Sequence, residues 1–77
     1  MKAIIVRADD WEGLFIDYKL VYEYHEIERA TLRKLCKEYD IKFTEIQEAW
    51  VTNEYEDYLN DAGSFHENLS DVGYELD

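Results

Sequence analysis

The sequence contains no proline, one cysteine and only three glycines in 77 residues. A single cysteine excludes a small domain stabilised by internal disulfides. No apolar run approaches the roughly 20 residues of a membrane-spanning helix, and no secretory signal is recognisable. We therefore expect a cytoplasmic protein that does not contact a membrane.

Basic residues are missing from the second half of the chain. All eight Lys and Arg residues precede position 43, whereas residues 43–77 carry ten acidic residues and no base, and the net charge is −11. Direct binding to nucleic acid requires Lys or Arg to neutralise phosphates, so we expect none. The charge instead predicts a basic protein surface as the partner, or self-association through the chain's own cations.

The length predicts one small domain over residues 1–77, and the strands and helices predicted below make it an α+β domain, with residues 64–77 as a docked or partly frayed tail. Aromatic residues make up 16% of the chain and can supply much of its core. The sequence has no glycine-rich phosphate loop and no nucleophile elbow, and a domain of this size has little room for a deep substrate pocket. We therefore expect a protein that is not an enzyme and binds no cofactor.

The stretch DWEGLFIDYKLVYEYHEI, residues 10–27, predicts two strands joined by a tight turn. Residues 13–16 and 19–24 are mostly aromatic, β-branched or leucine, and the polar pair Asp17-Tyr18 separates them. With these two as turn residues, Ile16 faces Lys19 and side chains alternate regularly along both strands. The face predicted to join the core comprises Gly13, Phe15, Leu20, Tyr22 and Tyr24; the other comprises Leu14, Ile16, Lys19, Val21 and Glu23.

Two further segments have clear periodicity. Residues 2–8 form an apolar run that predicts a central strand covered on both faces and paired with the hairpin. Residues 26–39 repeat apolar positions every three to four residues and predict an amphipathic helix. On another side of this helix Arg29, Arg33 and Lys37 form a basic strip, which suits either a solvated helix face or a docking strip for an acidic surface.

Residues 41–52 allow two interpretations. Thr44 followed by Gln47 resembles a capping box and predicts a helix, whereas the β-branched and aromatic content predicts a strand. We favour the strand, because Asn53 followed by Glu56 offers a new helix start. A second, acidic helix then covers residues 53–62 and ends at Gly63. The predicted order is strand-strand-strand-helix-strand-helix, with a small antiparallel sheet of three to four strands.

The hairpin, together with FHENLSDV at residues 65–72, resembles a set of short bacterial and phage proteins without known function. Those proteins carry an EGL-aromatic-x-DGKLV-x-EGH hairpin and a closing ENL-x-DV. The resemblance covers most of the chain and implies a strand within residues 41–52, but it implies no site residues. Tyr18 and Tyr24 stand where the pattern has glycine, and His66 stands where it often has proline.

Metal binding has little support in the sequence. His25, Cys36 and His66 lie in three different segments without the spacing of a zinc site. The turn carboxylates could hold a hard cation, but the calcium-loop pattern is absent, and solvated carboxylates are the simpler interpretation. These turn carboxylates are Asp9, Asp10, Glu12 and Asp17.

The sequence favours a protein-binding module that uses an acidic face interleaved with tyrosine. One concrete form is a phage-type inhibitor that imitates a run of phosphates and blocks a nucleic-acid-binding site; another is a homodimer in which the basic strip meets the acidic helix of a second copy. The simplest alternative is that the charge only keeps the domain soluble. The predicted acidic face comprises Glu45, Glu48, Glu54, Asp57, Tyr58 and Asp61.

Overall fold

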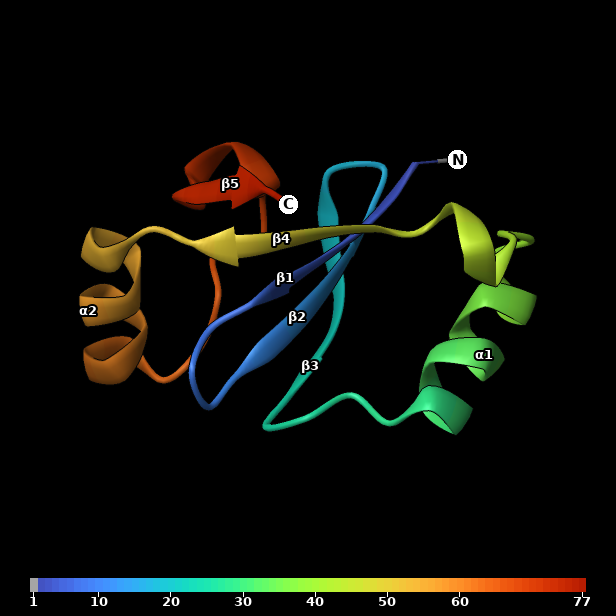
Figure 1. Cartoon of the computed structure of the whole chain (residues 1–77), viewed down its shortest axis with the longest axis horizontal. Helices are drawn as coiled ribbons and strands as arrows, with labels where there is room; N and C mark the ends of the chain where they lie inside the picture. Colours follow the sequence, from blue (N-terminus) through green and yellow to red (C-terminus); the bar gives the residue numbers. More distant parts are fainter. Residues whose placement is uncertain (1) are drawn as a thin grey trace.

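The computed structural model describes residues 2–77 and confirms an α+β fold of five strands and two α-helices (Figure 1). In chain order the elements are β1 Ala3–Arg7, β2 Glu12–Ile16, β3 Lys19–Tyr24, α1 Arg29–Glu38, the 3-10 helix η1 Phe43–Glu45, β4 Gln47–Val51, α2 Asn53–Ala62, the 3-10 helix η2 Leu69–Asp71 and β5 Tyr74–Leu76.

The strands form one mixed sheet in the order β3-β2-β1-β4-β5. β1 pairs antiparallel with β2 and parallel with β4, so the prediction of a purely antiparallel sheet with three to four strands is wrong. The parallel pair arises because the chain leaves β3, passes through α1 and enters β4 on the other side of β1. The fifth strand, β5, pairs antiparallel with β4 and comes from the predicted tail.

Both faces of the sheet are buried at β1, as its apolar run predicts. On one face, Ile4 and Val6 pack with Tyr55 and Leu59 of α2. On the opposite face, Ala3 and Ile5 pack with α1, whose contribution includes Leu32 and Cys36. Burial also raises the pKa of the Cys36 thiol. A central strand therefore separates two small cores, each closed by one helix.

The two-residue turn at Asp17-Tyr18 is confirmed, and both residues adopt positive φ, 49° and 70°. Ile16 pairs with Lys19 as predicted, but the register shifts between Leu14 and Phe15, so that Leu14 faces Tyr22. The predicted faces placed Tyr22 and Val21 on opposite sides of the hairpin, and this is wrong. Because of the bulge, both side chains pack with the α1-side core. Since Phe15 and Leu14 are buried on opposite sides, both faces of the hairpin join a core.

Residues 41–52 contain one turn of 3-10 helix followed by β4, so the strand interpretation holds for its second half. The start of α2 differs by one residue from the prediction. Thr52, not Asn53, is the N-cap, and its hydroxyl accepts a hydrogen bond from the Tyr55 backbone N–H. Gly63 ends the helix at φ 82° as predicted.

The tail after α2 crosses the sheet and protects an edge strand. The Leu20 backbone N–H donates to the Glu67 carbonyl, and the Leu69 N–H donates to the Tyr18 carbonyl, both at 2.8–2.9 Å. The Phe65 ring lies over Gly13, where an added Cβ would approach it to 2.7 Å. Glycine at position 13 therefore leaves the space that the tail uses to dock.

Candidate protein-binding surface

Four of the six predicted acidic-face residues share the exposed side of α2. Glu54, Asp57 and Asp61 are spaced three and four positions apart within the helix, so they follow one another along one face, and Tyr58 stands next to Asp57. All four are solvent-exposed, and none of the three carboxylates forms an ion pair within residues 2–77. The helix thus presents a row of unneutralised carboxylates beside one aromatic ring.

The tyrosine in this row is held in place by the core below it. The Tyr58 ring, 39% exposed, stacks on His66 with 4.5 Å between centroids and contacts the Tyr55 ring. His66 is fixed in turn, because its backbone N–H donates to the Tyr55 hydroxyl at 2.9 Å and its Nδ1 lies 2.8 Å from the same oxygen. A pre-ordered aromatic ring reduces the entropy cost of a contact.

Carboxylates from outside α2 add to this surface. The Asp9 carboxyl, in the β1–β2 turn, lies within hydrogen-bonding reach of Glu56 and raises the pKa of Glu56 above its usual value. On the other side, Glu75 of β5 lines the same surface hollow as Glu54. The predicted face omitted these residues because the turn and β5 approach α2 only in the folded chain. We call the surface formed by Asp9, Glu54, Glu56, Asp57, Asp61 and Glu75 the acidic end.

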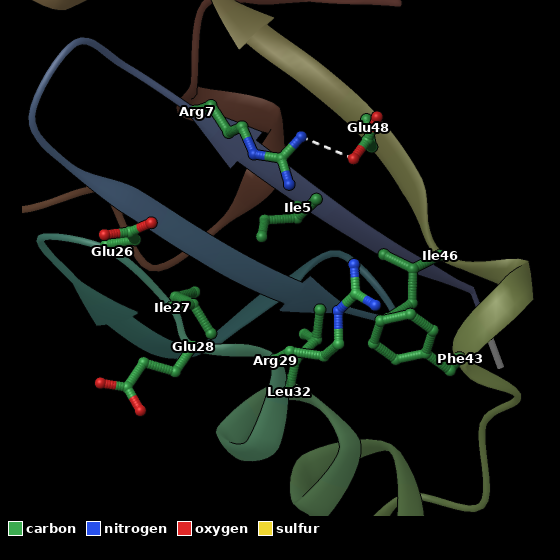
Figure 2. Close-up of a pocket in the computed structure, with 10 residues that line it drawn as sticks. All are labelled: Ile5, Arg7, Glu26, Ile27, Glu28, Arg29, Leu32, Phe43, Ile46 and Glu48. Atoms are coloured by element: carbon green, nitrogen blue, oxygen red, sulfur yellow. Dashed lines mark hydrogen bonds and ion pairs between the residues drawn. The ribbon is translucent and has the colours of Figure 1, made fainter.

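Glu45 and Glu48, the other two predicted members, lie elsewhere. Glu45 ends η1, which packs beside α1, and α1 and α2 occupy opposite ends of the long axis (Figure 1). Glu48 lies on the α1 side of the sheet, where its carboxylate accepts from Arg7 at 2.6 Å (Figure 2). Partial burial lowers the pKa of Arg7, but its contacts with Glu48 and Glu12 outweigh that effect and raise it. The six predicted residues therefore do not form one surface.

Comparison of the chain with protein-family models, curated proteins and solved structures finds no match. The chemistry of the surface is thus the basis for any functional assignment.

The predicted basic strip lies on α1, at the opposite end of the molecule from α2 (Figure 1). The guanidinium groups of Arg29 and Arg33 lie over the Phe43 ring, 5.9 and 5.2 Å from its centroid. Neither arginine, nor Lys37, forms an ion pair within the described residues 2–77. The strip therefore does not neutralise the acidic end of the same copy.

The side chains that could ligate a metal ion do not gather into one cluster in the described part of the chain. Among residues 2–77, no three His, Cys, Asp or Glu side chains are placed to hold a metal ion. The turn carboxylates have other contacts: Glu12 pairs with Arg7 at 3.1 Å, and Asp10 lies 3.7 Å from His25. Over the same residues, neither α1 nor α2 has the length and apolarity needed to cross a bilayer.

Proposed function

We propose that this chain is a non-enzymatic module that binds a basic surface of another protein through the acidic end. The observation that carries the proposal is the row of unpaired carboxylates on α2, beside an ordered tyrosine, in a half of the chain that contains no Lys or Arg. Such a surface attracts a cationic partner over distance, and tyrosine supplies contact area at low entropy cost.

The local cost of the charge supports a functional role for it. Asp61 lies in the last turn of α2, where the helix dipole disfavours negative charge, and Asp57 lies at the middle of the helix, where the dipole gives it no benefit. Asp9 and Glu56 place two carboxyl groups next to each other. A chain that needed charge only for solubility could place it without these conflicts, and local conflicts of this kind often mark functional surfaces.

The proposal is tested by capturing partners from a lysate of the producing organism on immobilised protein. Glu54→Lys with Asp57→Lys should abolish capture at low salt, because it reverses two central charges. The matched control, Glu38→Lys with Glu45→Lys, makes the same change in net charge at the α1 end and should retain the partner. Equal capture by both variants, or capture that is insensitive to salt, contradicts the proposal.

A phosphate-mimicking inhibitor is the more specific form of this proposal, because the carboxylates of α2 follow one another along a single face. The partner would then be a nucleic-acid-binding protein. A DNA or RNA duplex added to the captured partner should release it, whereas a duplex that leaves the complex intact supports a basic surface with another role.

A homodimer is the second candidate, favoured by the basic α1 strip and the acidic end lying at opposite poles. Contact between unlike ends of two copies is possible, but a net charge of −11 on each copy opposes association at low salt. Sedimentation at several concentrations and salt levels distinguishes the candidates. A monomer under every condition excludes the homodimer, whereas a mass that rises with concentration indicates self-association.

A further inference from the structure

Part of the α1-side sheet face is not covered by α1. The helix packs against Ala3, Ile5, Leu14 and Ile16, at the start of β1 and along β2. The end of β1 and the strands β4 and β5 lie beyond it, and the side chains there are mostly charged. In register across these three strands lie Arg7, Trp50 and Glu75.

Trp50 is the unusual residue on this face. The residue is 47% exposed, and its indole N–H forms no hydrogen bond with another group of residues 2–77. The second tryptophan, Trp11, packs against the α2-side core and donates its indole N–H to Glu23 at 2.7 Å. An exposed tryptophan between charged neighbours contributes little to folding, whereas tryptophan is enriched at the centres of protein interfaces.

Two surface hollows lie along this face and share Glu26. The first, of about 360 Å³, has an apolar floor of Ile5, Ile27 and Leu32 beside Phe43, and charged side chains form the rest of its lining (Figure 2). These charged residues are Arg7, Glu26, Glu28, Arg29 and Glu48. The second, of about 390 Å³, is lined by Trp50 together with carboxylates. An extended peptide segment lying across both hollows would meet the apolar floor of the first at one position. At another position it would meet the Trp50 ring and the carboxylates of the second.

The charges around Trp50 define what this second hollow can accept. Its lining includes four carboxylates and His25 but no Lys or Arg; the carboxylates are Asp9, Asp10, Glu12 and Glu26. The nearest guanidinium in register, that of Arg7, is already bound to Glu12 and Glu48. A cation placed over the indole gains from the ring quadrupole and from the surrounding carboxylates, whereas an anion would be repelled.

We propose that this open sheet face binds an extended partner segment that places a Lys or Arg side chain against Trp50 and an apolar side chain in the hollow above Ile5. The inference rests on the proposed function, because it names a contact made by the same basic partner. It adds that the partner's segment is cationic and apolar at neighbouring positions, so positive charge alone does not suffice for recognition here.

The test uses the full chain labelled with nitrogen-15 and a short capped peptide in which lysine and leucine alternate with serine. In an extended peptide, side chains two positions apart point the same way. The indole N–H signal of Trp50 should shift on titration and saturate, while that of Trp11 should stay in place as an internal control. Trp50→Thr identifies the signal, and Glu26→Gln should weaken binding about 2- to 10-fold. Glu38→Gln on α1 should leave the affinity unchanged.

Two control peptides sharpen the result. Replacing lysine with glutamate should abolish the shift, and replacing leucine with serine should weaken binding. Equal binding of either control overturns the inference. A peptide that shifts α2 amides but not the Trp50 indole overturns it while leaving the proposed function in place. If no signal moves, the inference is also overturned, and the lysate experiment decides the proposed function separately.

Discussion

At the scale of single residues, the hairpin turn carries backbone strain that glycine would relieve. Asp17 and Tyr18 both adopt positive φ, the geometry of the two-residue turn that matches strand twist. Aspartate tolerates this region, but tyrosine at φ 70° costs about 1 kcal/mol. The strain stays in place because the Tyr18 carbonyl accepts from Leu69 and ties the turn to the tail.

Tyr18→Gly should therefore raise the free energy of unfolding by about 0.5–1 kcal/mol, measured by urea denaturation. Tyr24→Gly is the matched control, because Tyr24 is also an exposed tyrosine but has no positive φ. Glycine at Tyr24, the last residue of β3, should lower the stability, since glycine loses more conformational entropy on folding and packs no side chain. Destabilisation by both substitutions would show that the turn is not strained.

Ionisation of Tyr55 should lower the free energy of unfolding at alkaline pH. Burial raises the pKa of Tyr55 above 10.0, although the hydrogen bond from the His66 backbone lowers it in part. Below about pH 10 the phenol is protonated in both the folded and the unfolded chain, so its stabilising contacts are fully present. As the pH rises further, the unfolded chain loses this proton first, and the free energy of unfolding falls.

Tyr55→Phe should cost about 1–3 kcal/mol at neutral pH, because the hydroxyl contacts His66 twice. It should also make the fall in stability between about pH 9 and about pH 11 shallower. Urea denaturation across this range measures both effects. If the free energy of unfolding of the variant falls as steeply with pH as that of the natural sequence, the titrating group is not Tyr55.

At the scale of elements, local patterns predicted the hairpin turn, both helices and the C-cap at Gly63. The bulge in β3 escaped prediction because alternation looks equally regular with or without one extra residue. It brings Glu23 to the α2-side face, where its carboxylate accepts from the Trp11 indole and the Phe65 backbone N–H. These contacts join residues 12 and 42 positions apart, which a local pattern cannot relate.

Local sequence patterns also could not predict that β4 pairs in parallel with β1 or that β5 exists. Both depend on which side of β1 the chain enters after α1, and residues 41–52 alone fit a strand of either direction. β5 has only three residues, Tyr74–Leu76, and too little alternation to be recognised. Its place is set by β4, with which Val51 and Tyr74 pair.

Within α2, stability and binding should respond in opposite directions to one substitution. Asp61→Lys removes a negative charge near the helix C-terminus and adds a favourable positive one, so it should stabilise the fold by about 0.5–1 kcal/mol in urea denaturation. The same change should weaken partner binding, because it reverses a charge of the acidic end.

Asn60→Lys is the matched control for this prediction. It adds a cation at the neighbouring position of α2 and keeps every carboxylate, so it should stabilise the helix similarly but weaken binding less. If Asp61→Lys stabilises the fold and leaves binding intact, Asp61 lies outside the interface.

At the scale of the whole molecule, the charge asymmetry along the sequence becomes an asymmetry in space. The basic strip on α1 and the acidic end lie at the two ends of a molecule that measures 32 × 21 × 21 Å (Figure 1). The sequence predicted Glu54, Asp57 and Asp61 of α2, because helical spacing fixes their face, but not Glu56 of the same helix. It could not exclude Glu45 and Glu48 or include Asp9 and Glu75, since these assignments depend on how η1, β5 and the β1–β2 turn pack.

The most direct test of the central claim is the dissociation constant of the captured partner at low and high salt. The variant Glu54→Gln, Asp57→Asn, Asp61→Asn should bind at least about tenfold more weakly at low salt and lose most of the salt dependence. The control Glu28→Gln, Glu38→Gln, Glu45→Gln removes three exposed carboxylates near α1 and should behave like the natural sequence. Equal weakening of both variants, or an affinity that does not change with salt, would contradict binding through the acidic end.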